Sequence, residues 1–135
     1  MKRMFFIALG LTAVALAETR ASLGQDQKQI EALYGKPQDD DPADADGVKT
    51  VTYQKGDYII LVQLYKGQSV AESFTRLDKR KLSEKETTIF LKANSGGKEW
   101  APVAGQKQHW ERNGGTVKAW CETLAGRPTF LVSAK

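Results

Sequence analysis

Cysteine and histidine are the scarcest reactive residues of this chain, since Cys121 and His109 each occur once in 135 residues. One cysteine cannot form an intramolecular disulfide, the cross-link that many small exported domains use to supplement a small core. A structural or catalytic zinc site needs three or four ligands, which one histidine and one cysteine cannot supply. We therefore expect no disulfide, no metal and no cofactor.

Known catalytic signatures are also absent. The sequence contains no G-x-S-x-G, no phosphate-binding loop, no H-E-x-x-H and no C-x-x-C. The acidic stretch at residues 39–47 is similar to a calcium loop, but aligning Gly47 with the invariant glycine places Pro42 and Tyr53 at the first and last ligand positions. A calcium loop needs carboxylates there. We expect a solvated loop and predict no catalytic residue.

The chain has little excess charge of either sign. Its formal charge of +4 at pH 7 falls to +2 without Lys2 and Arg3. The only basic cluster is residues 79–81, whereas nucleic-acid-binding domains concentrate basic residues in a patch or stripe. We therefore expect a solvated linker at residues 79–81 and no nucleic-acid partner.

The start of the chain has the three parts of a secretory signal peptide. Lys2 and Arg3 precede an apolar run at residues 5–16, and a small-residue Ala-Leu-Ala segment ends at Ala17. The run is well short of the about 20 apolar residues that span a bilayer. We expect residues 1–17 to be cleaved and the protein to be periplasmic or extracellular. Because no cysteine is available there to accept a lipid, we expect no membrane insertion after cleavage.

Residues 18–135 contain an internal repeat with an offset of 59 residues. Glycine and asparagine suit a left-handed helix end, and glycine suits a tight turn. The offset relates Leu23 to Leu82, Ile30 to Ile89, Gly35 to Asn94, and Gly67 to Gly126. The repeat predicts a single domain made of two units, at about residues 22–76 and 82–135.

Each unit has the pattern of one short helix followed by three strands. Ser83 and Glu86 form a capping box at the start of the second helix, while Gly35 and Pro37 end the first. Glycine-containing turns separate the predicted strands, at residues 48–54, 58–65, 68–76, 106–112, 115–124 and 127–133. The fold class is therefore α+β: two tandem α-β-β-β units form one antiparallel sheet, with the helices packed on one face.

Two-residue turns fix the register of neighbouring strands and decide which side chains share a face. Asn113-Gly114 places Trp110 opposite Val117, and Ala125-Gly126 places Trp120 opposite Leu131. The side chains expected under the helices are Trp110, Val117, Ala119, Cys121, Phe130 and Val132, and in the first unit Tyr53, Tyr58, Ile60, Val62, Leu64 and Ala71. The opposite face is expected to carry Lys107, His109, Glu111, Thr116, Lys118, Trp120, Glu122, Thr129 and Leu131, and in the first unit Thr50, Thr52, Ile59, Leu61, Tyr65, Val70, Glu72 and Phe74.

The helix-free face thus has an aromatic and aliphatic stripe bordered by polar groups. Exposed apolar patches with polar rims mark binding surfaces, in which Trp and Tyr are frequent anchors. The alternative is that the C-terminus, the loop at residues 95–105 or a second protomer covers this face. The register also points His109 and Cys121 to opposite faces, which argues against a thiol–imidazole pair. The predicted partner-binding residues are Trp120, Leu131, His109, Ile59, Leu61 and Tyr65.

The order of helix, Tyr-Gly-x-Pro and three-stranded meander resembles two groups of exported bacterial proteins. These are the small outer-membrane-assembly lipoproteins of the SmpA/OmlA type and the β-lactamase-inhibitor-protein fold. The resemblance rests on Ile30 to Pro37 (IEALYGKP), Val51-Thr52-Tyr53 and the Tyr65-Lys66-Gly67 turn. The tandem arrangement is more similar to the inhibitor protein, in which two such units form one sheet with a concave, partner-binding face. The cysteines of both groups are missing here, so the resemblance implies fold and exported binding modules, not β-lactamase inhibition.

These observations favour an exported, non-enzymatic binding module whose partner is another protein, and they leave its oligomeric state open. An inhibitor of a secreted hydrolase and a structural cell-envelope protein are the alternatives. An enzyme would require the polar side chains of the helix-free face, His109, Glu111, Lys118 and Glu122, to converge in a concavity.

Overall fold

The structure, a computed structural model, describes residues 23–112 and 114–134, so the expected signal peptide at residues 1–17 lies outside the described part. Neither helix in the described part has the length and apolar character needed to cross a bilayer. The elements in chain order are α2 (Gln27–Tyr34), β1 (Asp39–Asp40), β2 (Val48–Lys55), β3 (Tyr58–Tyr65), β4 (Gln68–Arg76), α3 (Glu84–Ala93), β5 (Trp100–Pro102), β6 (His109–Arg112), β7 (Val117–Leu124) and β8 (Arg127–Ala134).

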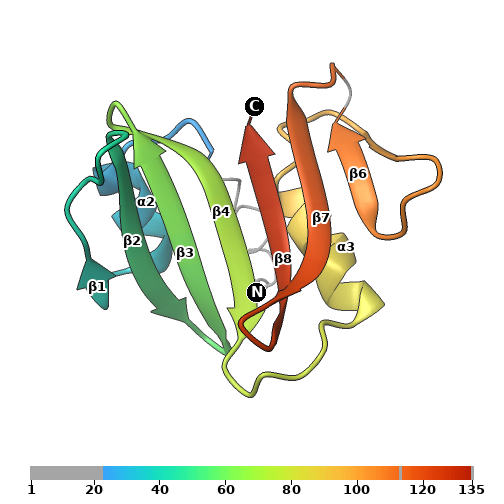
Figure 1. Cartoon of the computed structure of the whole chain (residues 1–135), viewed down its shortest axis with the longest axis horizontal. Helices are drawn as coiled ribbons and strands as arrows, with labels where there is room; N and C mark the ends of the chain where they lie inside the picture. The colour runs from blue at the N-terminus through green and yellow to red at the C-terminus, as the bar shows by residue number, and fades with distance from the viewer. Residues whose placement is uncertain (1–22, 113, 135) are drawn as a thin grey trace, which may run out of the picture.

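The described strands form one antiparallel sheet in the order β1-β2-β3-β4-β8-β7-β6-β5. Both helices lie behind this sheet, and the opposite face carries no helix (Figure 1). The last strand of the first unit, β4, pairs with the last strand of the second unit, β8, at the centre of the sheet. The predicted α+β class is therefore confirmed, with tandem units that join in one sheet and helices on one face.

The helix caps follow the sequence signals, but the two helices are not spaced as the repeat predicted. Asp26 with Gln29 and Ser83 with Glu86 both form capping boxes, and the capping residues are 57 rather than 59 positions apart. The position equivalent to the buried Ile30 is therefore not Ile89, which is partly exposed, but Thr87, which is buried.

The expected left-handed helix end is found in neither helix. Gly35 has a positive φ of 92°, but its ψ of −163° lies outside the left-handed helical region, and Asn94 has a φ of −102°. The buried side-chain amide of Asn94 donates a hydrogen bond to the Phe90 carbonyl oxygen (2.8 Å), which also accepts one from the Asn94 backbone N–H (3.1 Å).

Several predicted strand ends and loops need correction. The acidic stretch is not wholly a loop, because Asp39–Asp40 forms β1 and pairs with β2. The loop at residues 95–105 likewise contains β5 (Trp100–Pro102), which pairs with β6. The turn that contains Gly114 is also longer than two residues, so Trp110 pairs with Ala119 instead of Val117. This shift of two positions preserves which side chains share a face, since strand side chains alternate with period two. The other turn is as predicted, and Trp120 pairs with Leu131.

A β-bulge in β4 overturns part of the predicted facing of the first unit. The register between β3 and β4 changes from Leu64 opposite Ser69 to Gln63 opposite Ala71, which leaves Val70 as the extra residue. One extra residue reverses the alternation beyond it. Ala71 was expected under the helices and instead lies on the helix-free face.

The same reversal turns Glu72 and Phe74, both expected on the helix-free face, toward the helices. Both are buried there. Glu72 accepts a hydrogen bond from the hydroxyl of Tyr34 in α2 (2.8 Å). At the bulge, the backbone of Ser69 bonds to Gly24 and Gln25 ahead of α2. β8 pairs with β4 only from Ala71 to Thr75, so the segment of β4 before Ala71 bonds instead to the chain before α2.

The core lies between the sheet and the two helices and is continuous across both units. Phe74 of β4 and Phe130 of β8 both pack against Phe90 of α3, with ring centroids 4.7 and 5.5 Å apart. Such aromatic pairs contribute about 0.5–1.5 kcal/mol beyond their buried area. The predicted helix-facing side chains of the second unit lie in or against this core.

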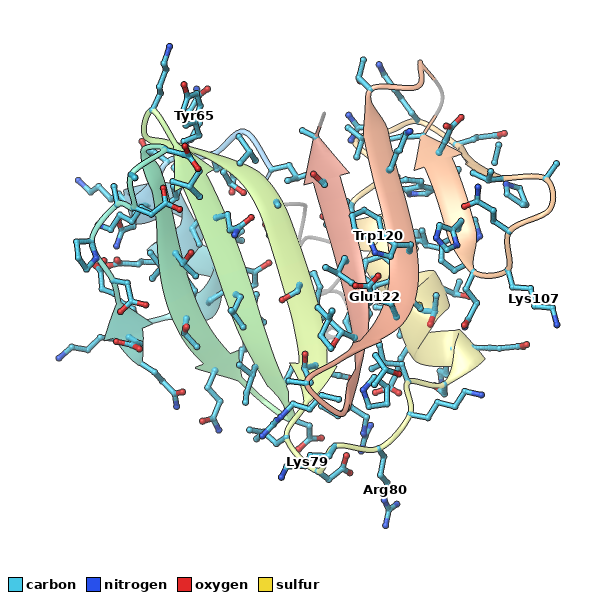
Figure 2. The ribbon with its side chains drawn as sticks, in the orientation of Figure 1. Tyr65, Lys79, Arg80, Lys107, Trp120 and Glu122 are labelled. Atoms are coloured by element: carbon cyan, nitrogen blue, oxygen red, sulfur yellow. The ribbon has the colours of Figure 1, made fainter. Side chains whose placement is uncertain are left out.

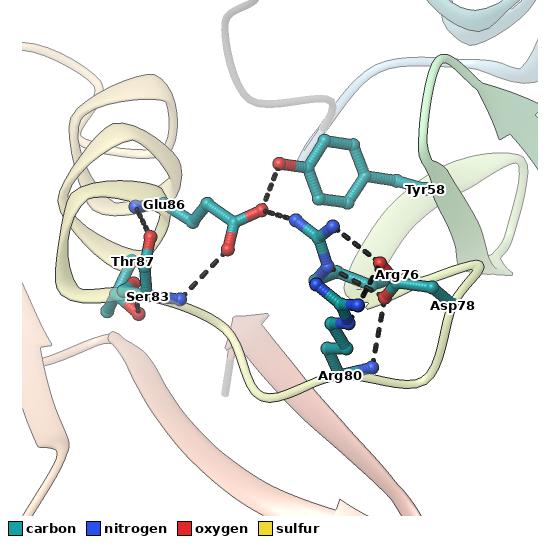
Figure 3. A network of polar contacts seen from close by, with 7 residues as sticks. All are labelled: Tyr58, Arg76, Asp78, Arg80, Ser83, Glu86 and Thr87. Atoms are coloured by element: carbon teal, nitrogen blue, oxygen red, sulfur yellow. Dashed lines mark hydrogen bonds and ion pairs between the residues drawn. The ribbon is translucent and has the colours of Figure 1, made fainter.

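A polar network fastens the end of β4 to the start of α3 (Figure 3). Arg76 forms ion pairs with Glu86 and Asp78, each at 2.7 Å, and Glu86 also accepts hydrogen bonds from the Tyr58 hydroxyl and the Ser83 backbone N–H. Burial alone would raise the pKa of Glu86, but the hydrogen bonds from Tyr58, Ser83 and Arg76 outweigh burial and lower it. These contacts hold the beginning of the linker between the two units, at Arg76 and Asp78, against the start of α3.

Deleting Val70 should remove the bulge and leave Phe74 in the core, because Ser69 opposite Leu64 and Ala71 opposite Gln63 then become consecutive pairs of a regular ladder. Deletion of Leu131 in the regular strand β8 is the matched comparison. It must reverse the facing on one side of the deletion and turn Phe130 or Val132 out of the core, at a cost of about 3–5 kcal/mol in the free energy of unfolding. Chemical denaturation measures both variants, and the loss for the Val70 deletion should be much the smaller. Equal and large losses for the two deletions would contradict the bulge.

Replacing Glu86 with Gln should destabilise the protein near neutral pH by about 1.5–3 kcal/mol, the usual value of hydrogen bonds to a charged group. Because the folded-state pKa of Glu86 is lowered, its stabilisation is present above the unfolded-state pKa and is lost as the pH falls through the folded-state pKa. The difference between wild type and Glu86→Gln in denaturant titrations should therefore shrink on acidification from about pH 7 to about pH 2. A difference that does not change with pH would show that the charge of Glu86 is unimportant.

Candidate functional site: a trough on the helix-free face

The helix-free face, called the outer face below, is organised in rows that run across the strands. Strand pairing places one side chain from each of six strands in the central row. Its members, from β2 to β6, are Thr52, Leu61, Ser73, Leu131, Trp120 and His109. Large apolar side chains on β3 and β7 thus lie on either side of the central strands.

On the outer face β4 carries the small side chains of Ala71 and Ser73, which leaves a hollow of about 300 Å³ beside Leu131 of β8. We call this hollow the trough. Leu61 of β3 and Trp120 of β7 form its two walls, and they occupy positions 59 residues apart, the offset of the strand repeat. Its lining is completed by Gln63, Ala71, Ser73, Leu124, Leu131 and Ser133, with Glu72 and Val132, whose side chains lie on the other face.

Trp120 is held in place by its neighbour on the same strand. Its indole N–H donates a hydrogen bond to a carboxylate oxygen of Glu122 (3.1 Å). Figure 2 shows both side chains on β7 at the face turned to the viewer. The ring is half-buried, so a partner could cover its remaining surface at little cost in side-chain entropy.

The outer face carries little charge over four neighbouring strands. The outward positions from β2 to β8 are held by Val48, Thr50, Thr52 and Gln54; by Ile59, Leu61, Gln63 and Tyr65; by Ala71, Ser73 and Thr75; and by Arg127, Thr129, Leu131 and Ser133. Among these positions only Arg127, opposite Leu124 at the start of β8, is charged. Further charges lie on β7 and β6, where Lys118 and Glu111 lie 3.8 Å apart.

The structure brings together three of the six predicted partner-binding residues, Trp120, Leu131 and Leu61, around the trough. Leu61 is 37% exposed. The other three predicted residues share the outer face but do not line the trough: Ile59, Tyr65 and His109. Tyr65 is 43% exposed at the end of β3, near the hairpin turn (Figure 2).

Sequence reasoning missed five residues that line the trough. The predicted strand alternation places Leu124 and Ser133 on the outer face, as observed. They were left out of the predicted stripe because Leu124 lies at the end of its strand and Ser133 is polar. Ala71 and Ser73 were missed because the bulge reverses their facing. The fifth, Gln63, is polar, and a prediction built on apolar anchors passes over it.

The polar side chains that an enzyme would need do not converge. His109 contacts the carbonyl oxygen of Lys107 through Nδ1 (2.8 Å), and Glu111 is paired with Lys118 while Glu122 is bonded to Trp120. In residues 23–112 and 114–134, no group of three or more His, Cys, Asp or Glu side chains could hold a metal ion.

Cys121 lies on the face of the sheet opposite to His109, as predicted. It packs against the helix-side core, and burial raises the pKa of its thiol. A thiol with a raised pKa is a poor nucleophile at neutral pH. The arrangement brings no thiolate and imidazole together.

Comparison with known proteins gives a fold and no family. No family of known proteins matches the sequence, and no curated protein matches it. A cysteine-rich secretory protein from Staphylococcus aureus is similar in structure, with a TM-score of 0.51 and 15% identity over 84% of this chain and 45% of that chain. An extracellular protein containing a SCP domain from Bacillus anthracis has a TM-score of 0.44 and 10% identity over 84% of this chain and 44% of that chain. The chain therefore spans less than half the length of either protein, and the first likeness shows a shared fold alone.

Proposed function

We propose that this chain is an exported, non-enzymatic binding module that holds another protein in the trough of its outer face. The observation that carries the proposal is the trough itself, which has apolar walls, hydroxyl-bearing small side chains at its centre and uncharged outward side chains on β2, β3 and the part of β4 beyond the bulge. Concave apolar surfaces with a few polar groups are the usual binding sites of proteins.

Export is supported by two observations of different kinds. The sequence begins with the three parts of a signal peptide. In addition, the fold is shared with part of a protein described as secretory. These observations support the proposed periplasmic or extracellular location.

Trp120 and Leu131 are the anchors of the proposed contact. Interface energy is concentrated in a few central side chains, among which tryptophan is enriched, and removing such an anchor costs about 2 kcal/mol or more. Leu61 supplies the opposite wall, so a partner side chain that enters the trough would contact both units of the fold. The binding surface would thus exist only when the two units are joined.

Replacing Trp120 and Leu131 together by Ala should weaken binding by at least about 30-fold, because a loss of about 2 kcal/mol corresponds to that ratio. The measurement is affinity capture from the host's extracytoplasmic extract, followed by titration of the captured protein against both forms. Leu77→Ala is the matched control, since Leu77 is an exposed leucine that follows β4 and does not line the trough. Recovery of the same proteins at the same affinity by wild type and double variant would rule out the trough.

A further inference from the structure

β7 is paired unequally along its two edges. β8 pairs with the whole strand, Val117–Leu124, whereas β6 pairs only with residues 118–120. One further bond beyond these runs from the Cys121 backbone N–H to the Gln108 carbonyl oxygen (3.1 Å). β7 thus continues past the end of β6 (Figure 1), and residues 122–124 have no neighbouring strand on that side in the described part of the chain. We call this stretch the free edge.

The strand pairing identifies the backbone groups at the free edge. Successive residues of a strand point their N–H and C=O groups to alternate sides, and the N–H of Cys121 points to the β6 side. Thr123 therefore also points both groups away from β8, where its opposite residue is Pro128. Among the described residues, neither the N–H nor the C=O of Thr123 has a hydrogen-bond partner. The free edge thus offers one donor and one acceptor to an added strand.

The two ends of the described sheet are protected against strand addition, in contrast to the free edge. β5 contains Pro102, and β1 consists of Asp39 and Asp40. Proline and charged side chains on an edge are the usual devices that prevent pairing with another chain. Thr123 is exposed, uncharged and β-branched, and β-branched residues favour strands. The position that offers its backbone groups therefore carries none of these protections.

A hollow of about 170 Å³ lies beside the free edge. Cys121 and Thr123 line it from the helix side of β7, and the buried Leu82, ahead of α3, adds an apolar wall. A cavity of about 150 Å³ can hold a group of the size of benzene. The hollow therefore has room for one side chain of a strand added at Thr123. Strand addition typically combines main-chain bonds with such side-chain pockets.

Two residues in the segments that border the hollow have an uncommon backbone conformation. Gln108 and Lys79 have φ values of 54° and 64°, although neither is glycine. The other described non-glycine residues with a positive φ, Lys66 and Ala125, lie in two-residue hairpin turns, which favour it. At Gln108 the positive φ ends the strand conformation, so the chain leaves β7 where the free edge begins. Strained residues of this kind cluster at binding sites.

The border of the hollow is basic. Lys81 lines the hollow and is the last residue of the basic run at residues 79–81. Of this run, only Arg80 forms an ion pair in the described part of the chain, with Asp78 at 3.9 Å. The carboxylate of Glu122, which also lines the hollow, already accepts a hydrogen bond from an indole N–H. Charge complementarity therefore favours an acidic ligand.

From these observations we infer that the free edge binds an extended, acidic segment of another protein as an added strand. The segment bonds to the N–H and C=O of Thr123, with one apolar side chain in the hollow and an acidic side chain beside Lys81. This site is distinct from the trough, since the two hollows share no lining residue. The inference goes beyond the proposed function and does not depend on it.

A selection of random peptides tests the inference. Peptides of about eight residues, enough for one strand, are displayed and selected on the immobilised protein. The enriched sequences should combine an apolar residue with acidic ones. Synthetic copies are then N-methylated at one residue at a time. The residue paired with Thr123 should lose at least about tenfold in affinity and its two neighbours should tolerate the methyl group, because an added strand points alternate N–H groups to its partner.

Protein variants locate the bound peptide. Thr123→Pro removes the outward N–H and no bond of the β7–β8 ladder, because Thr123 and Pro128 form a pair without mutual hydrogen bonds, and it should weaken binding by at least about tenfold. Lys81→Glu should weaken binding by at least about fivefold. Lys28→Glu, the same charge change at an exposed position of α2, is the matched control and should leave the affinity within about twofold. If Thr123→Pro unfolds at a lower denaturant concentration, the N-methyl scan and Lys81→Glu decide.

The outcomes separate the inference from the proposed function. Peptides that tolerate N-methylation at every position, or that bind equally to wild type, Thr123→Pro and Lys81→Glu, would overturn the added strand, as would the absence of any enriched peptide. Peptides that lose affinity only when Trp120 and Leu131 are replaced by Ala would overturn the free edge and support the trough. The proposed function itself is contradicted only by the capture experiment with that double variant, so the two claims fail separately.

Discussion

The pairing of β4 with β8 is the interaction on which the rest of the structure depends. It joins the final strands of two α-β-β-β units and converts two small meanders into one sheet. A three-stranded meander with one short helix buries little apolar surface, and small domains are marginal for that reason. With the units joined, Phe74, Phe90 and Phe130 form a single cluster that neither unit could form alone.

The same pairing creates the trough. Because β4 and β8 bring Ser73, Ala71 and Ser133 to the centre of the outer face, the larger side chains of β3 and β7 stand above them on both sides. The fold therefore separates two tasks between the faces of one sheet. The helix side provides stability, with Glu86 and Arg76 holding the linker at its edge. The outer side is left with a concave and largely uncharged centre.

Most of the fold could be predicted from local signals. The capping box at Ser83, the turn at Ala125-Gly126 and the alternation along β3 each depend on a few adjacent residues, and the structure agrees with all three. Prediction failed where the outcome depends on distant partners. At the bulge, the backbone of Ser69 bonds to Gly24 and Gln25 ahead of α2. Neither a turn residue nor the apolar alternation near Val70 indicates this contact in the sequence.

The candidate site was predictable in part for the same reason. Trp120, Leu131 and Leu61 follow from turn register alone, whereas Ala71 and Ser73 lie on the outer face only because of the bulge. An unbulged β4 would place Phe74 on the outer face, fill the hollow and expose the core. The accommodation of one extra residue in a bulge, instead of in the ladder, therefore decides both the packing of the core and the shape of the binding surface.

Thiol labelling at position 71 tests this account most directly. In a Cys121→Ala background, Ala71→Cys introduces a thiol that the structure places in the open trough and an unbulged register places under the helices. The account predicts rapid modification of Ala71→Cys in the folded protein, with Ala119→Cys, on the buried helix side, protected. Protection of Ala71→Cys to the same degree as Ala119→Cys would contradict the bulge and the trough together.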